Sequence, residues 1–270
     1  MRVKEFIEAD LGVFHSLEER EVHLWLIRWP NIESMILEHW NLLEDSEKLE
    51  VSKYRNQVDR MCSGAGRIIS KMLLAQYLKV ANSDIKIVKG KFGKPGMKRI
   101  KGKDLLKYSV SHSADMVVIA VTKNLTVGVD TEIVRAFPEY KEIAGNFFTK
   151  MESEAICKSQ NAELFFYYWT AKEAYVKALG LGLHKSLNSF SVQAGHIVEG
   201  GKLRSDWQVI SGKDQKEYTT TIAVKSKGGS RCIRTYATKR ILANTKIWRA
   251  GSALPSENNW KPGHSDIKER

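Results

Sequence analysis

The chain has 270 residues, 43% of them hydrophobic, which is enough for one large domain or two packed halves. Lys and Arg outnumber Asp and Glu by 43 to 31, and the resulting formal net charge of +12 favours an anionic partner. No apolar run has the length needed to cross a bilayer, and three dispersed cysteines argue against a disulfide scaffold. We therefore expect a soluble, cytoplasmic protein with no membrane partner.

The first part of the chain mixes strand and helix patterns. Residues 21–29 (EVHLWLIRW) are predicted to form a strand and residues 34–54 a helical segment. Residues 61–80 carry apolar side chains at helical spacing, which predicts a longer amphipathic helix. A second stripe on this helix is polar or cationic and consists of Arg60, Ser63, Arg67 and Lys71. Such a helix can bury one face and present positive charge from another, although an ordinary solvated face is the simpler reading.

Two strands and a glycine-containing loop follow this helix. The loop contains FGKPG (92–96), which by itself indicates a turn. Residues 105–124 read as two strands joined by a tight polar turn at 113–115. The pattern then changes near residues 122–126, where we place the boundary between two halves of the chain.

Asp130 and Glu132 interrupt the otherwise apolar, strand-like run 125–134 (LTVGVDTEIV). Alternate side chains of a strand share a face, so both carboxylates point the same way, together with Gly128. They would lie roughly 6.5 Å apart along the strand, close enough to repel each other if the site is partly buried. A hard cation would remove this conflict.

The rest of the chain predicts a second α/β unit. Thr149 and Glu152 form a T-x-x-E capping box that starts a helix, and a second helix is predicted over about 163–179. Residues 187–193 and 218–226 supply strands. We expect an α/β (α+β) fold of two similar halves that form a pseudo-dimer within one chain. The predicted divisions are 1–123, 124–240, and a polar basic tail, 241–270, without regular structure.

The helix over 163–179 carries Glu173 and Lys177, four residues apart on one face. Such a pair is common on helix surfaces, where it contributes roughly 0.2–0.5 kcal/mol. The run of five aromatic residues at 165–169 makes this helix too apolar for a solvated spacer, so Glu173 is expected to border a core or a cleft.

Several motifs, in this order and at these intervals, resemble the signature of the Sfp-type 4′-phosphopantetheinyl transferases. They are SVSHS (109–113), VGVDTE (127–132), FFTKMESEAI (147–156) and YWTAKEAYVKALGLGL (168–183). The segment 59–78 is similar to that family's nucleotide-contacting helix, and FGKP to its substrate loop. The resemblance implies transfer of 4′-phosphopantetheine from coenzyme A to a carrier-protein serine, with release of adenosine 3′,5′-bisphosphate. It also implies an active site in the cleft between the two halves.

The resemblance assigns roles at the reaction centre. Asp130, Glu132 and Glu173 match the family's acidic triad, and Mg²⁺ prefers such oxygen ligands. Glu173 is the candidate base, with Glu132 or a metal-bound water as alternatives. Lys177 would neutralise charge on the leaving phosphate, and Lys172 would do similar work on coenzyme A or be an ordinary solvated lysine. The implied enzyme is a Mg²⁺-dependent transferase of the holo-acyl-carrier-protein synthase type.

The resemblance also assigns residues to coenzyme A, the co-substrate. Phosphates and adenine would be contacted by Arg60, Ser63, Arg67, Lys94, Ser111 and His112, with Lys53 as a weaker candidate. A lone histidine in a strand turn is otherwise most often a structural hydrogen bonder.

The implied partner is an acidic acyl or peptidyl carrier protein of fatty-acid, polyketide or nonribosomal-peptide synthesis, which a basic enzyme would attract at low salt. One chain with two halves would suffice as a monomer. Two other classes stay open: a non-catalytic protein of the same fold that binds coenzyme A or a nucleotide, and a basic nucleic-acid module. The chain lacks the zinc-finger spacing and the RNP-type aromatic signature, which speaks against nucleic acid.

Overall fold

A five-stranded sheet forms the base of the first half. The computed structural model describes residues 2–8, 16–103, 105–213, 218–225 and 232–237, so the predicted tail 241–270 lies outside the described residues. The sheet has the order β1 (Arg2–Glu8), β13 (Cys232–Ala237), β2 (Glu21–Arg28), β6 (Met116–Lys123), β5 (Leu106–Ser113). The central strands β2 and β6 are almost wholly buried because both faces of the sheet are covered. The strands predicted at 21–29 and 105–124 are confirmed.

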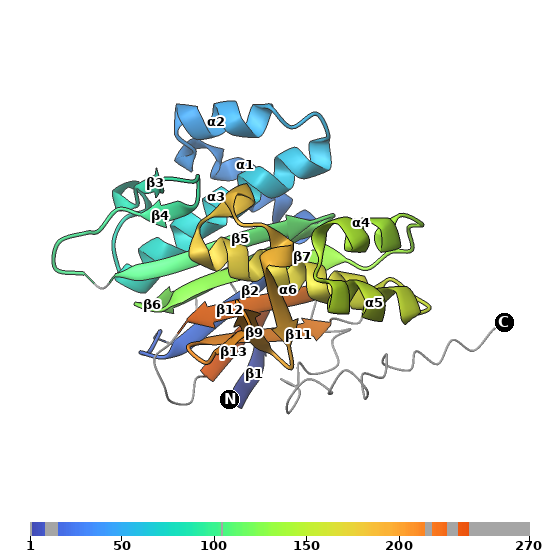
Figure 1. Cartoon of the computed structure of the whole chain (residues 1–270). Coiled ribbons are helices and arrows are strands. Elements are labelled where there is room, and N and C mark those ends of the chain that lie inside the picture. The colour runs from blue at the N-terminus through green and yellow to red at the C-terminus, as the bar shows by residue number, and fades with distance from the viewer. Residues whose placement is uncertain (1, 9–15, 104, 214–217, 226–231, 238–270) are drawn as a thin grey trace.

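The long helix α3 (Gln57–Leu78) lies across this sheet (Figure 1). Asn56 caps its start by accepting a hydrogen bond from the Val58 amide, and Lys79 ends it in the left-handed region at φ 52°. The absence of a side chain at Gly66 lets the helix approach Val110 of β5; a Cβ there would lie 3.1 Å from that side chain. The apolar face predicted for residues 61–80 is therefore the face that packs on the sheet.

Short helices cover the outer side of α3. They are η1 (Trp29–Ile32), α1 (Glu33–Glu38), η2 (Trp40–Leu42) and α2 (Asp45–Ser52). The helical segment predicted over 34–54 is thus interrupted: the His39 ring bonds to the Met35 carbonyl, and the Glu44 amide donates to the Glu47 carboxylate to start α2. After η3 (Asn82–Asp84), the small hairpin β3 (Ile87–Lys89) and β4 (Pro95–Met97) follows.

The second half repeats the scheme of one long helix on one sheet. Its main sheet has the order β11 (Trp207–Lys213), β12 (Tyr218–Lys225), β7 (Thr126–Ile133). Its helices are α4 (Tyr140–Phe147), α5 (Lys150–Lys158), α6 (Glu163–Leu179), η4 (Gly182–His184) and η5 (Leu187–Ser189). A smaller sheet consists of β10 (Lys202–Arg204), β9 (His196–Glu199) and β8 (Phe190–Gln193). The capping box at Thr149 is confirmed, since this residue and Glu152 bond to each other's backbone amides.

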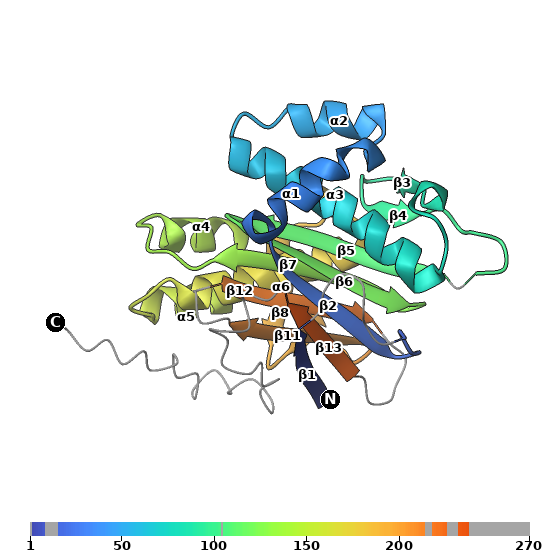
Figure 2. The ribbon, with the colours of Figure 1, turned by 180° about the vertical axis from the view of Figure 1, so that it is seen from behind.

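The two halves meet through an apolar layer. Buried residues of β2 and β6, such as Leu24 and Val118, pack with Val129 of β7 and Ile222 of β12. The expectation of two α/β halves is confirmed. One strand crosses between them: β13, which we had placed with the second half, pairs in parallel with β1 and β2 of the first sheet (Figure 2). None of the described helices combines the length and apolar composition that a bilayer crossing needs.

Candidate active site

Strands β5 and β7 lie side by side where the two sheets meet (Figure 1). Three serines on one face of β5, namely Ser109, Ser111 and Ser113, connect the two strands. The Ser109 hydroxyl accepts a hydrogen bond from the Val129 amide at 3.1 Å, and the Ser113 hydroxyl accepts one from the Ile133 amide at 3.2 Å. Side-chain oxygens thus take the place of backbone carbonyls along this seam.

Helix α6 packs closely on β7 because β7 has a glycine at the crossing point. A Cβ on Gly128 would collide with the carbonyl oxygen of Ala174 and the backbone of Ala178. Gly128 shares a strand face with Asp130, so this close approach brings the helix face that carries Glu173 and Lys177 over the two acids of β7. The shared face of Asp130 and Glu132 predicted from the alternation is present.

Asp130 is the most buried acid of this group, with 3% of its surface exposed. Its Oδ1 accepts hydrogen bonds from the Ser111 hydroxyl at 2.7 Å and from the Lys177 ammonium at 2.6 Å, and Lys177 also donates to Ser111 at 2.8 Å. Its Oδ2 is buried and has no hydrogen-bond partner within the described part of the chain. A buried carboxylate oxygen without a partner is costly, so a cation, a water or a substrate group at this position would stabilise it.

The two glutamates near Asp130 have perturbed acidities. Burial, followed by repulsion from Asp130, raises the pKa of Glu132 to about 7, although the Ser113 hydroxyl donates to it at 2.7 Å. The same two causes raise the pKa of Glu173, with Lys177 opposing them. Glu173 makes no hydrogen bond to any described residue. Burial is the larger cause and the negative charge of Asp130 the second, and a bound cation would oppose both by favouring the ionised carboxylates.

The donor set suits a hard divalent cation, and the Asp130 Oδ2 atom is the structural feature that fits it. Carboxylate oxygens are the ligands that Mg²⁺ prefers, and Mg²⁺ is usually held by one or two carboxylates together with substrate phosphates and water. Among the described residues, no three His, Cys, Asp or Glu side chains converge closely enough to form a complete protein cage. The site therefore fits a cation that shares its ligands with a bound substrate.

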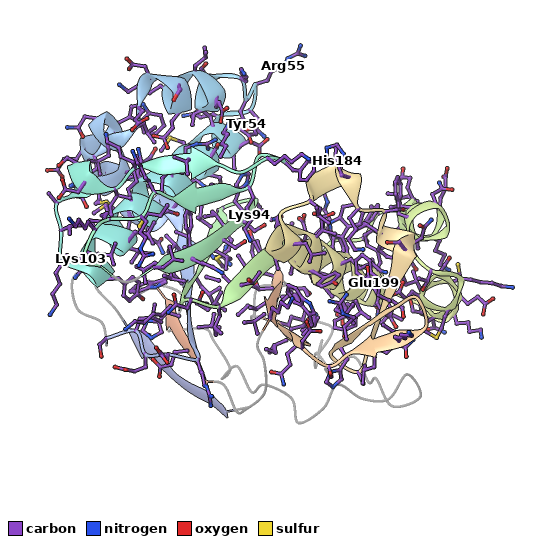
Figure 3. All side chains as sticks on the ribbon, turned by 60° about the vertical axis from the view of Figure 1, so that its left-hand side comes forward. Tyr54, Arg55, Lys94, Lys103, His184 and Glu199 are labelled. Atoms are coloured by element: carbon purple, nitrogen blue, oxygen red, sulfur yellow. The ribbon has the colours of Figure 1, made fainter. Side chains whose placement is uncertain are left out.

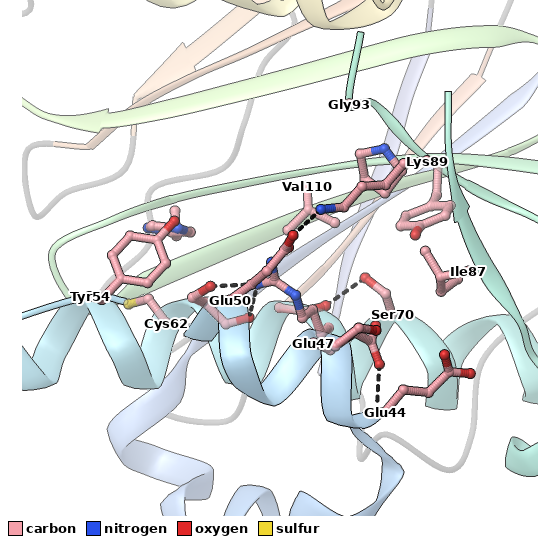
Figure 4. A pocket seen from close by; sticks show the side chains of 17 residues that line it. Glu44, Glu47, Glu50, Tyr54, Cys62, Ser70, Ile87, Lys89, Gly93 and Val110 are labelled. Atoms are coloured by element: carbon pink, nitrogen blue, oxygen red, sulfur yellow. Dashed lines mark hydrogen bonds and ion pairs between the residues drawn. The ribbon is translucent and has the colours of Figure 1, made fainter. Parts of the chain in front are cut away.

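A cavity of about 450 Å³ lies in the first half between α2, α3, β5 and the β3–β4 hairpin (Figure 4). Ser63, Arg67 and His112, which we had assigned to coenzyme A, line it. The Arg67 guanidinium donates to the Ser63 carbonyl at 3.0 Å and to its hydroxyl, and pairs with Glu50 at 3.1 Å. All lining residues come from positions 44–112, so this cavity belongs to the first half rather than to the space between the halves.

His112 connects the cavity to the acids. It lies on β5 next to Ser111, lines the cavity, and has its ring 6.4 Å from that of Tyr54 in an edge-on arrangement. Burial, followed by the nearby Lys177 ammonium, lowers its pKa. The imidazole is therefore mainly neutral at pH 7 and acts as a hydrogen-bond donor or acceptor rather than as a fixed positive charge.

Two of the residues predicted to contact coenzyme A, Lys172 and Arg60, lie away from both the cavity and the acids. The Lys172 ammonium is fully buried, pairs with Glu152 at 2.8 Å, and donates to the Leu187 and Phe190 carbonyls. These partners occupy all three of its donors, so this placement does not support a contact with coenzyme A and makes Lys172 part of the core of the second half. The exposed Arg60 does not line the cavity, and its guanidinium donates to the Tyr54 carbonyl at 2.9 Å.

Lys94 lies between the two halves (Figure 3). Its ammonium donates at 3.0 Å to the carbonyls of Val127 on β7 and Ala178 at the end of α6, and burial, aided by Lys107, lowers its pKa to about 8. In this position it fastens the loop of the first half to the two elements that carry the acids. The structure thus gives Lys94 a joining role that the G-K-P turn alone does not indicate.

Sequence reasoning missed Lys89 and Glu50, which pair with each other at the cavity. Lys89 is one of many lysines in 86–107, and nothing in the sequence marks it. Lys71, in the predicted cationic stripe, is 2% exposed and pairs with Glu47 at 2.5 Å. In the sequence, the three serines that connect β5 to β7 are indicated by the alternation of serine in SVSHS (109–113).

Known proteins match both halves of the chain. A family model described as the 4′-phosphopantetheinyl transferase superfamily matches residues 126–223, and one described as 4′-phosphopantetheinyl transferase, N-terminal, matches residues 27–124. The 4′-phosphopantetheinyl transferase HetI of Nostoc sp. is 32% identical over 173 residues, which cover 63% of this chain and 73% of HetI. The L-aminoadipate-semialdehyde dehydrogenase-phosphopantetheinyl transferase of Mus musculus is 26% identical over 218 residues, covering 70% and 69%. The 4′-phosphopantetheinyl transferase gsp of Aneurinibacillus migulanus is 34% identical over 142 residues, covering 51% and 56%.

Proposed function

Because this chain belongs to the 4′-phosphopantetheinyl transferase superfamily, we propose that it moves the 4′-phosphopantetheine group of coenzyme A to a serine hydroxyl of an acyl or peptidyl carrier protein. The serine oxygen forms a bond to phosphorus, the bond from that phosphorus to the oxygen of adenosine 3′,5′-bisphosphate breaks, and the serine proton passes to a base. The alternative of a non-catalytic binding protein is not favoured, because relatives that cover 63% and 70% of this chain carry the names of transferases.

The observation that carries this proposal is the buried Asp130 Oδ2, which has no partner within the described residues. Asp130 would hold Mg²⁺ together with substrate oxygens, and Glu132 and Glu173, which are not grouped with it as a set of three ligands in the described structure, would complete the protein ligands when the cation and substrate bind. When bound, Mg²⁺ supplies positive charge that stabilises the pyrophosphate of coenzyme A as the leaving phosphate gains charge. The raised pKa values of both glutamates agree with acids placed for a cation.

The chain's own residues position the reactants and move the proton. Glu173 has a raised pKa and no hydrogen bond to a described residue, so we assign it the proton of the carrier serine, with Glu132 as the alternative. Lys177 is held by Asp130 and Ser111 and keeps 32% of its side chain exposed, which leaves it able to reach a phosphate oxygen. Arg67 and His112 line the cavity that would take the nucleotide end of coenzyme A.

The carrier protein is proposed to be acidic, since the chain has a net charge of +12 and opposite charge speeds encounter at low salt. One chain contains both halves, so we propose a monomeric enzyme.

The test is transfer to apo carrier proteins. The purified protein is incubated with coenzyme A, Mg²⁺ and a panel of apo carriers, and each intact carrier is weighed by mass spectrometry. The expected result is a gain of one phosphopantetheine that EDTA abolishes and added Mg²⁺ restores. Transfer that persists in EDTA would overturn the metal assignment. If the protein binds coenzyme A but transfers phosphopantetheine to no carrier, the non-catalytic binding protein becomes the favoured alternative.

A further inference from the structure

The cavity of the first half carries more negative than positive side chains. Arg67 and Lys89 are its cations, whereas three glutamates from the segment that forms α2 also line it. His112 adds no fixed charge, because its pKa is lowered by burial and by Lys177. Coenzyme A is a polyanion, so a carboxylate that already pairs with the cations of the cavity competes with it for them.

The three glutamates make different contacts. Glu47 is committed to the buried Lys71 at 2.5 Å and to the Glu44 amide at 2.9 Å, which starts α2. Glu44 pairs with Lys86 at 3.3 Å on the surface and takes part in the capping box that starts α2. Glu50 alone contacts both cations of the cavity: its Oε2 lies 3.1 Å from Arg67, and its Oε1 pairs with Lys89 (Figure 4).

Glu50 is also free to move away from both cations. About a third of its side chain is exposed, as are 29% of Arg67 and 57% of Lys89, so water can replace each contact. Ion pairs this exposed contribute little to stability. Arg67 stays anchored to Ser63 without Glu50, through the Ser63 carbonyl at 3.0 Å. The hydrogen bond from Lys89 lowers the pKa of Glu50, which keeps it ionised at neutral pH.

We propose that Glu50 is an internal anion that occupies a phosphate position between Arg67 and Lys89 and that a phosphate monoester of the ligand displaces it. This inference rests on the proposed function, in which that group is the 3′-phosphate of coenzyme A. A carboxylate on two cations presents the same pair of acceptors that a phosphate would use. Glu50 thereby lowers the affinity for coenzyme A. It also reduces the difference in affinity between coenzyme A and an analogue without the 3′-phosphate.

The test compares two ligands and two variants. Dissociation constants for coenzyme A and 3′-dephospho-coenzyme A are measured by titration calorimetry with wild type, Glu50→Gln and the matched control Glu44→Gln. Glu44 lines the same cavity but does not touch Arg67 or Lys89. Removing one negative charge beside a phosphate dianion is expected to tighten coenzyme A binding by about tenfold in Glu50→Gln. The same variant is expected to change 3′-dephospho-coenzyme A binding by less than about twofold, on the same electrostatic grounds.

Three outcomes would overturn the proposal: weaker or unchanged binding of coenzyme A in Glu50→Gln, equal tightening of both ligands, or equal tightening in Glu44→Gln. Weaker binding would mean that Glu50 holds the Arg67 and Lys89 side chains in position for coenzyme A instead of competing with its phosphate for them. The dissociation constants can be measured without turnover, so they test the role of Glu50 separately from the proposed function. If the proposed function is wrong, the wild type will transfer no phosphopantetheine to a carrier protein. Thermal melts without ligand confirm that each variant is folded.

Discussion

The two carboxylate oxygens of Asp130 differ in their hydrogen bonding. Oδ1 holds Ser111 and Lys177, whereas Oδ2 has no partner within the described residues. We expect Asp130→Asn to lower the transfer rate by at least about a hundredfold, because the amide removes the charge that a divalent cation needs. Isotope-labelled or mass-based transfer assays across a Mg²⁺ titration measure this loss.

The control for Asp130→Asn is Glu154→Gln, which removes a carboxylate from the exposed side of α5, 55% of it accessible. This control should retain wild-type rates and Mg²⁺ dependence. The melting temperature of Asp130→Asn without metal should stay near that of wild type or rise, since a buried carboxylate oxygen is replaced by a neutral group. Full activity in Asp130→Asn would refute the cation site.

Lys172 and Glu152 form a fully buried ion pair, and removing one partner strands the other charge. We expect Lys172→Met to lower the free energy of unfolding by about 3–5 kcal/mol. The variant Lys172→Met/Glu152→Gln should recover part of that loss, which denaturant titrations of wild type, the single variants Lys172→Met and Glu152→Gln, and the double variant would reveal. If Lys172 touched coenzyme A, the folded single variant would bind it more weakly; we expect unchanged affinity.

Residue type alone does not show that Lys172 belongs to the core whereas Lys177 faces the candidate active site. Both lie on α6 within a motif typical of the family, and helical spacing places them on different faces without saying which face is buried. The decision comes from partners distant in the sequence: Glu152 faces Lys172, and Asp130 faces Lys177. A capping glutamate that also reaches into a core has no local sequence signal beyond the capping box itself.

At the scale of elements, the crossing of α6 over β7 determines the geometry of the acids. We expect Gly128→Ala to destabilise the fold by about 3 kcal/mol or more, because the added methyl meets the backbone of α6, which cannot yield as a side chain would. The displaced helix should also carry Glu173 and Lys177 away from Asp130. Denaturant melts and transfer rates measure the two effects separately.

Gly145→Ala in α4 is the matched control. Its added Cβ would have the Ser153 hydroxyl as its nearest neighbour, at 4.0 Å, so no collision occurs. Alanine favours the helix over glycine by about 1 kcal/mol, so the variant should be as stable as wild type or more stable. An equal loss of stability in both variants would contradict the role of Gly128.

Helices and strands with strong local sequence signals were predictable, whereas the breaks within a predicted helical segment were not. The alternation over 125–134 predicts β7, and the Thr149 capping box predicts the start of α5, because both signals are local. The break between α1 and α2 depends on the His39 ring turning back to Met35, and on the contact of α2 with α3. No period of hydrophobic residues encodes such a contact.

At the scale of the molecule, a charged cluster helps to join the halves. Asp115, in the turn between β5 and β6, accepts hydrogen bonds from Arg28 of β2 at 2.5 Å and from the Tyr218 hydroxyl of β12 at 2.7 Å. Burial raises the pKa of Asp115, but the hydrogen bonds from Arg28 and Tyr218 outweigh it, so the net shift is downward from 3.8.

This lowered pKa gives a pH dependence with a definite sign. The unfolded chain binds the proton more readily than the folded one, so the contribution of Asp115 is full above pH 3.8 and disappears as the pH falls through the lower folded value. We expect Asp115→Asn to melt below wild type at pH 5–7 and the two to converge toward pH 3. A constant difference in melting temperature over this range would contradict the assignment.

The strand β13 determines the order in which the polypeptide can complete its structure. Residues 232–237 lie between β1 and β2, so the first sheet contains a gap until nearly the whole chain has been synthesised. Domains usually fold as units during synthesis, N-terminal part first, and pairing between distant segments is slow. A fragment that ends before residue 232 would leave β1 and the edge of β2 as open strands, which attract other chains. Despite its two-part design, we therefore expect the molecule to fold as a single unit that β13, the last strand of the described residues, closes.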